Sequence, residues 1–181
     1  SHISIVDGDG NAVAMTTTIE AAFGSRMMVE GFLINNELTD FSFEPIDQAG
    51  RPVANRVEAG KRPRSSMAPT LVFGPDGELL MVTGSPGGSR IILYVLKSLL
   101  CVIDWKCSAQ QATDLVNFGS RNGPFEVEIG VAGAQLGVVM GLEGQSIRPV
   151  PMTSGLHIIV KRDGMLEGAA DPRREGAALG E

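Results

Sequence analysis

A glycine-rich turn is the first of four groups of residues in this chain that could carry chemistry. The stretch GSPGGSR, at 84–90, lies between a predicted strand and a predicted helix. Glycines there let backbone N–H groups approach a ligand closely, which suits a phosphate or an oxyanion. The stretch matches neither common nucleotide-binding pattern, and no lysine follows it to reach a phosphate. From these residues alone, an ordinary Gly-Gly turn is the default interpretation.

Two loops offer polar groups of opposite kinds. KRPRSSM places Ser65 and Ser66 beside basic side chains, a combination that can hold a carboxylate. Glu20, Glu37 and Asp40 form an acidic set, and the last two stand three residues apart in NNELTDFS, which suits an ammonium group. Taken separately, a basic serine turn and a solvated acidic turn are the commoner explanations.

The first residues form the fourth group. A free α-amino group has a pKa of about 7.7–8, so it can act as a base for an adjacent hydroxyl. A chain that begins at Ser1 by cleavage could therefore use one residue as both nucleophile and base. An arbitrary boundary is the simpler explanation of the same start. His2 alone decides nothing, because a histidine on a strand more often packs than takes part in catalysis.

The elements that must position these groups are strand pairs and helices. Alternating residues at 2–7 and 11–18 around DGDG predict one hairpin, and PTLVF and ELLMVTG around GPDG predict a second. Between Phe23 and Ser66 the periodicity is weak and Gly, Pro and Asn recur, which is typical of a functional or lid-like loop.

The second half predicts helices followed by a closing hairpin. An apolar helix is expected over about 89–103, and a second over about 108–117, where Ser108 and Gln111 form a capping box. A strand FEVEIGV, a helix AQLGVVMGLEG and a hairpin GLHIIVKRDGMLEGAAD follow. Together these elements predict one α+β domain over 1–181 with a largely antiparallel sheet.

Composition excludes several classes of function. A net charge of −6 and 5% aromatic residues argue against a nucleic-acid partner. The longest apolar run is interrupted by Lys97 and Ser98 and is too short for a membrane span. Cys101 and Cys107 have no companions at metal-ligand spacing, so we interpret them as buried thiols.

Taken together, the stretches resemble the small subunit of γ-glutamyltransferases (γ-glutamyl transpeptidases). SHISIVDGDGNAVAMTTTI, FGSR, LINNELTDFS, KRPRSSMAPTLVF, TGSPGGSRII and ADPRREG occur in the family's order and cover nearly the whole chain. The resemblance implies the N-terminal-nucleophile hydrolase fold, a four-layer αββα sandwich made when a precursor cuts itself into two subunits. It also implies a large subunit as partner, no metal or organic cofactor, and a periplasmic or secreted enzyme, with the cytoplasm as the alternative.

The resemblance assigns catalytic roles to four positions. The family's small subunit begins with a threonine whose hydroxyl attacks the γ-glutamyl amide, and SH matches the two residues after it. We therefore expect the nucleophilic threonine directly before Ser1, with Ser1 as the alternative nucleophile. Thr18 matches the threonine that hydrogen-bonds the nucleophile, and Gly87 and Gly88 match the oxyanion hole.

Substrate-binding roles follow in the same way. Ser65 and Ser66 match the serines that bind the donor's α-carboxylate, and Glu37 and Asp40 match the groups that hold its α-ammonium. Glu20 stands where the best-known members have an asparagine, so three carboxylates surround one cation.

The expected reaction is γ-glutamyl transfer from glutathione or a similar amide to water or an amine acceptor. Glu20 keeps open a related cephalosporin or glutaryl acylase, and the start at Ser1 keeps open a binding homologue without a nucleophile. The stretch between Phe41 and Lys61 carries a lid over the site in some members of the family that this chain resembles. It is short here, which suggests a more open cleft.

Overall fold

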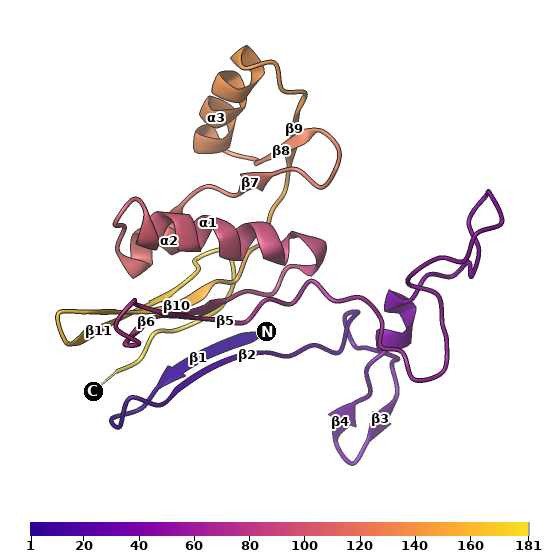
Figure 1. Ribbon diagram of the computed structural model, residues 1–181, viewed down its shortest axis with the longest axis horizontal. Coiled ribbons are helices and arrows are strands. Elements are labelled where there is room, and N and C mark those ends of the chain that lie inside the picture. Colours follow the sequence, from indigo (N-terminus) through magenta and orange to yellow (C-terminus); the bar gives the residue numbers. More distant parts are fainter. Residues whose placement is uncertain (181) are drawn as a thin grey trace. The chain divides into compact units, whose positions relative to one another are not determined.

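The computed structural model describes residues 1–180, which form two compact units. The first unit consists of Ser1–Thr16 together with the chain from Met67 onward, and the second consists of Thr17–Ser66. Figure 1 labels their helices and strands. The single domain expected over 1–181 stays a prediction.

A four-stranded antiparallel sheet in the order β11-β10-β6-β5 is the centre of the first unit. Two hairpins supply it, as the sequence predicts. Their turns contain glycines with positive φ, Gly77 and Gly164, where a side chain would strain the backbone. The strands are β5 Thr70–Phe73, β6 Leu79–Gly84, β10 His157–Arg162 and β11 Met165–Ala170. Because β6 ends at Gly84, the sheet leads directly into the glycine-rich turn.

The predicted N-terminal hairpin packs on one face of this sheet (Figure 1). It comprises β1 (His2–Val6) and β2 (Ala12–Thr16), paired antiparallel. One face of the hairpin is turned toward β6 and β10, and on it His2 is buried. The other face carries four exposed apolar side chains, Ile3, Ile5, Val13 and Met15.

Two helices cover the opposite face of the sheet (Figure 1). α1 spans Ile91–Ile103, after a short 3₁₀ turn η2 (Gly88–Arg90), and α2 spans Ala109–Asp114. The Ser108–Gln111 capping box is confirmed, but α2 ends three residues early because Leu115, with ψ of 133°, is not helical. The core between helices and sheet contains Met81, Cys101, Val102, Ala109, Ala112, Leu156, Ile158, Val160 and Ala169. Helices, sheet and hairpin make three consecutive layers of the expected sandwich.

The cysteines form a disulfide, so the expectation of free thiols is wrong. After α1 the chain reverses, and the N–H of Cys107 donates to the carbonyl oxygen of Cys101 at 2.9 Å. This reversal brings the two Cα atoms to 5.2 Å, within bonding range. A spacing of six residues does not reveal the reversal, because it depends on α2 docking against the sheet.

A smaller three-stranded sheet carries the third helix. Its strands are β7 Phe118–Gly119, β8 Phe125–Glu128 and β9 Ile147–Val150, and α3 spans Val131–Leu142. β8 and β9 are parallel, joined by α3 as a crossover, whereas every other strand pair is antiparallel among residues 1–180. Gly133 lies so close to the carbonyl of Glu128 that a Cβ would collide with it.

The second unit is mostly loop, as the weak periodicity predicts. It contains a two-stranded ribbon, β3 (Met28–Val29) with β4 (Phe32–Leu33), and a 3₁₀ turn η1 (Glu37–Asp40). Phe41 is buried directly after η1. Side-chain hydrogen bonds therefore carry much of the order in this unit.

Among residues 1–180, no helix is long and apolar enough to cross a bilayer. The same residues contain no cluster of three or more His, Cys, Asp or Glu side chains that could hold a metal ion.

Candidate active site

The glycine-rich turn has the geometry that an oxyanion site needs. Gly87 and Gly88 have φ of +140° and +60°, conformations that favour glycine. A Cβ on Gly87 would lie 2.5 Å from Tyr94 Cε2, whereas a Cβ on Gly88 would meet open space. Within residues 1–180, neither N–H donates a backbone hydrogen bond, so both donors remain available to a ligand.

A buried serine fixes this turn. Ser85 is fully buried, and its hydroxyl donates to the carbonyl of Pro86 at 2.7 Å. The same hydroxyl oxygen accepts from the N–H of Gly155 at 3.0 Å. The turn that carries Gly87 is thereby tied to the chain just before β10.

The start of β1 lies beside the end of β6, three residues before the glycine pair. The ring of His2 packs so closely on Gly84 that a Cβ there would collide with it. His2 Nδ1 lies 2.7 Å from Thr16 Oγ1 and its Nε2 lies 3.2 Å from Ser4 Oγ. Burial and the charge of Arg174 lower the pKa of the Ser1 α-amino group below 8.0. In the alternative in which Ser1 is the first residue of the processed chain, a lowered pKa leaves more of this amine neutral at pH 7 and able to accept a proton.

A buried neutral histidine makes the fold sensitive to acid. Burial, with the charges of His157 and the Ser1 α-amino group, lowers the pKa of His2 from 6.5 to about 4. In the unfolded chain His2 takes up a proton below pH 6.5, whereas the folded ring stays neutral down to about pH 4. The free energy of unfolding therefore falls as the pH drops through this window.

Replacing His2 with glutamine should remove this acid sensitivity. Between pH 7 and pH 4.5 we expect wild type to lose about 2–3 kcal/mol more stability than His2→Gln. Urea unfolding of the assembled protein at the two pH values measures the difference. Equal losses in both proteins would contradict a neutral buried His2.

In the second unit, Thr18 and Glu20 form a tight turn. Thr18 Oγ1 accepts a hydrogen bond from the backbone N–H of Glu20 at 2.8 Å. Glu20 has φ of +68°, which is unusual for a side chain of this size. Because the Thr18 oxygen already accepts one bond, its O–H proton can be donated elsewhere.

The acidic set converges as the sequence suggests. Glu37 and Asp40 lie on η1, and desolvation together with Asp40 and Glu20 raises the pKa of the Glu37 carboxyl. Glu37 Oε1 is buried and has no hydrogen-bond partner among residues 1–180. Such a group is suited to an added cation or donor.

A single asparagine ties the serine segment to the acidic turn. Asn55 Nδ2 donates to the carbonyl of Asp40 at 2.7 Å, and Asn55 Oδ1 accepts from the N–H of Arg64 at 2.9 Å. Ser65 and Ser66 follow directly. The residues expected to bind a carboxylate and an ammonium therefore lie on two tethered loops.

The expected site residues divide between the two units. Ser1, Gly87 and Gly88 lie in the first, and Thr18, Glu20, Glu37, Asp40, Ser65 and Ser66 lie in the second. Within each unit, hydrogen bonds or close packing connect the elements that carry them.

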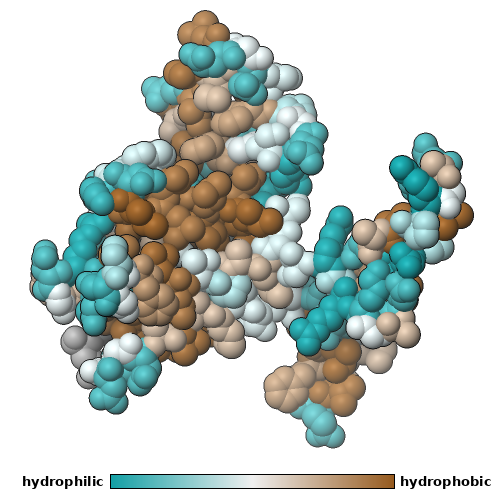
Figure 2. Space-filling model, viewed as in Figure 1, coloured by the Kyte–Doolittle hydropathy of each residue, from teal (hydrophilic) through white to brown (hydrophobic). Residues whose placement is uncertain are grey.

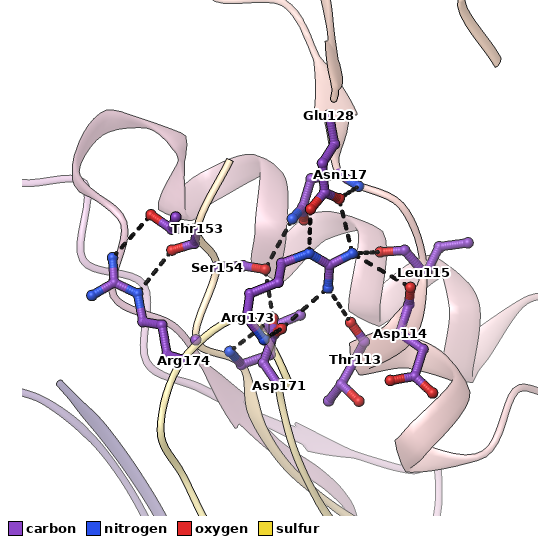
Figure 3. A network of polar contacts seen from close by, with 12 residues as sticks. Thr113, Asp114, Leu115, Asn117, Glu128, Thr153, Ser154, Asp171, Arg173 and Arg174 are labelled. Carbon is purple, nitrogen blue, oxygen red and sulfur yellow. Dashed lines mark hydrogen bonds and ion pairs between the residues drawn. The ribbon is translucent and has the colours of Figure 1, made fainter. Parts of the chain in front are cut away.

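Sequence reasoning missed a partly buried ionic network in the stretch ADPRREG (Figure 3). The Arg173 guanidinium makes two bonds to the Glu128 carboxylate, at 2.5 and 2.8 Å, and one to Asp171 at 3.1 Å. It also donates to the carbonyls of Thr113 and Leu115 at the end of α2. The partners are up to 60 positions away in sequence, so no local pattern signals them.

The core consists of helices, a sheet and a hairpin in layers, and the first strand begins beside a glycine turn whose N–H groups can bind an oxyanion. This combination defines the N-terminal-nucleophile hydrolase class. The family model described as gamma-glutamyltranspeptidase matches residues 1–181, and the chain belongs to this family.

Relatives agree with this assignment. The glutathione hydrolase proenzyme of Escherichia coli is 41% identical over 96% of the chain and 31% of its own length. The one from Bacillus subtilis is 37% identical over 99% of the chain and 30% of its own length. The chain thus spans about a third of the length of these curated relatives.

Solved structures match over nearly the full length of both chains. The γ-glutamyltranspeptidase of Helicobacter pylori, as a mutant, has a TM-score of 0.82 and 36% identity, covering 96% of this chain and 99% of that one. The Pseudomonas nitroreducens enzyme complexed with L-DON has a TM-score of 0.82 and 31% identity, covering 99% and 98%. A cephalosporin acylase from Bacillus halodurans shares the fold, with a TM-score of 0.83 at 24% identity over 99% of this chain and 34% of that one.

Proposed function

We propose that the chain is the small, catalytic subunit of an enzyme that transfers a γ-glutamyl group from glutathione or a similar amide to water or an amine. The observation that carries the proposal is the pair of tethered loops in the second unit. Asn55 joins the loop of Ser65 and Ser66 to that of Asp40. Hydroxyls on one loop and carboxylates on the other complement the zwitterionic head of a glutamyl donor.

In the proposed reaction a hydroxyl at the start of β1 attacks the γ-carbonyl carbon. Its proton passes to the free α-amino group and then to the leaving amine, as the amide C–N bond breaks and an ester forms. The N–H groups of Gly87 and Gly88 stabilise the oxyanion. Water or an acceptor amine then cleaves the ester and regenerates the hydroxyl.

The proposed nucleophile is a threonine directly before Ser1, with Ser1 as the alternative. Thr18 is proposed to donate a hydrogen bond to it. N-terminal sequencing of the processed enzyme distinguishes the two, because the nucleophile is the first residue that cleavage exposes.

A large subunit from the same precursor is the proposed partner. The name proenzyme, carried by relatives about three times as long, supports a cleaved precursor. Exposed apolar side chains also support a partner that would bury them. The outer face of the β1–β2 hairpin pairs Ile3 with Met15 and Ile5 with Val13, all exposed. Further apolar side chains gather over α1 (Figure 2).

The disulfide supports a periplasmic or secreted location. Bonds such as Cys101–Cys107 persist in oxidising compartments and are rare in the cytosol.

A comparison of two anilides tests the function. We expect kcat/KM for γ-glutamyl-p-nitroanilide to exceed that for glutaryl-p-nitroanilide by at least about 100-fold, because only the first offers an ammonium to Glu37 and Asp40. Release of p-nitroaniline by the assembled enzyme measures both. Asp40→Asn should reduce the preference.

The second candidate, a glutaryl acylase, is kept open by one departure from the best-known members, the Glu20 carboxylate in place of an asparagine, which lies close enough to Glu37 to raise its pKa. Activity on the glutaryl anilide alone would establish it and overturn the first. Turnover of neither substrate, by a folded and processed protein, would favour a binding homologue.

A further inference from the structure

We propose that Asn36 is a positioning residue that sets the turn of Thr18 and Glu20 against the acidic turn η1. The inference rests on the proposed function, in which Thr18 serves the nucleophile and the carboxylates hold the donor's ammonium. Asn36 immediately precedes η1 and touches neither the nucleophile nor the cation in this scheme.

All the polar atoms of the Asn36 side chain are engaged. Nδ2 donates to Glu20 Oε2 at 2.5 Å and to Thr39 Oγ1 at 3.1 Å. Oδ1 accepts from the N–H of Ala21 at 3.0 Å. The backbone N–H of Asn36 also donates to the carbonyl of Ile19 at 3.3 Å. Asn36 therefore bonds to Glu20 and to the residues on either side of it, and it also contacts the turn η1 that carries the other two carboxylates.

These contacts stabilise an unfavourable backbone. Glu20 has φ of +68°, a conformation that is unfavourable for a residue with a side chain. In that conformation its N–H reaches Thr18 Oγ1. Asn36 therefore fixes the orientation of the Thr18 hydroxyl by holding Glu20 in place. Loss of the Asn36 hydrogen bonds should leave both Glu20 and the Thr18 hydroxyl free to reorient.

The side-chain amide of Asn36 suits a position between the Glu20 carboxylate and the N–H of Ala21. The Glu20 carboxylate can only accept hydrogen bonds when ionised, and Nδ2 supplies a donor without adding charge. An aspartate at position 36 would keep the acceptor for Ala21 but would repel Glu20. With Glu37 and Asp40 it would make a fourth acidic group around one cation.

A double-mutant cycle of Asn36→Asp and Glu20→Gln tests the inference. Asn36→Asp should raise KM for γ-glutamyl-p-nitroanilide at least tenfold, with a smaller loss in kcat. In the double variant the new glutamine can donate to the new aspartate, which restores the bond with its direction reversed. We expect the double variant to return to within threefold of Glu20→Gln alone in kcat/KM.

Asn35→Asp is the matched control. It adds the same charge one residue away and keeps the acceptor that Asn35 Oδ1 provides for the N–H of Glu37. We expect its KM to stay within threefold of wild type. Thermal unfolding of every variant reports stability independently of turnover.

Three outcomes would overturn the proposal. The first is an Asn36→Asp enzyme with wild-type KM and kcat. The second is a rise in KM in Asn35→Asp equal to that in Asn36→Asp. The third is a double variant in which the two substitutions are coupled in melting temperature but not in kcat/KM. The cycle is measured on whichever anilide wild type hydrolyses. A wild type active only on the glutaryl anilide would refute the proposed function, whereas the coupling still decides the role of Asn36.

Discussion

Gly87→Ala is expected to lower kcat on γ-glutamyl-p-nitroanilide by about 100- to 1,000-fold, with little change in KM. The backbone at Gly87 has φ of +140°, and the new methyl group would lie 2.5 Å from the Tyr94 ring. The turn must therefore shift, and its N–H donors move with it. The hydrogen bonds of Ser85 fix the turn at its β6 end, so the displacement falls on Gly87 and Gly88 and not on β6.

Two glycines provide controls for this prediction. Gly88 also has positive φ, but a methyl group there meets no atom within 4 Å, so Gly88→Ala should cost tenfold or less. Gly123 has open space and no positive φ, and Gly123→Ala should retain wild-type kcat. Steady-state kinetics, with circular dichroism to verify folding, measures all three. A Gly87→Ala enzyme with near-normal kcat would remove the glycine pair from the oxyanion site.

Local signals were sufficient for most elements of the fold. Each hairpin has a turn glycine, and the Ser108–Gln111 capping box marks the start of α2, so these features depend on neighbours within a few positions. The parallel pairing of β8 with β9 was not predicted, because β9 contains Pro149 and has no alternation. The disulfide was missed since its geometry depends on tertiary docking of the second helix.

The sequence predicted the residue types of the candidate site but not the side chains that hold its loops in place. The acidic set was visible in sequence, and Glu37 and Asp40 indeed share one turn. Catalytic roles came from the family resemblance, because a Gly-Gly turn alone is ambiguous. Asn36 and Asn55 are ordinary loop residues in sequence, and their partners lie about 15 positions away. Only the folded chain reveals that these amides hold the loops together.

The buried network around Arg173 supports the other half of the site. Asp171 accepts from Ser154 Oγ at 2.5 Å, and the next residues along, Gly155 and Leu156, bond to Ser85 and Asp171. The segment that steadies the glycine turn is thus itself held by the C-terminal ADPRREG stretch. A change at Arg173 should therefore act on the whole first unit rather than on one loop.

Arg173→Ala is expected to destabilise the protein by about 3–5 kcal/mol and to lower the melting temperature by about 10 °C. The Arg173 side chain is 16% exposed, and its removal leaves Glu128 and the fully buried Asp171 side chain without their cation. It also removes a donor from the carbonyls of Thr113 and Leu115, of which Leu115 still accepts from Lys97 Nζ. Unpaired buried charges cost more than the pair contributes, which is why truncation is worse than the energy of one salt bridge.

Arg173→Lys gives a graded measurement if the alanine variant does not fold. Lysine keeps the charge but cannot make the paired contacts to Glu128, so an intermediate loss is expected. Arg174→Ala is the matched control, since that neighbouring side chain is exposed and, among residues 1–180, its hydrogen bonds go to Thr153. It should cost about 1 kcal/mol or less. Thermal and urea unfolding of the assembled enzyme compare the three. Equal losses at 173 and 174 would contradict the network, because only Arg173 is partly buried and paired with carboxylates.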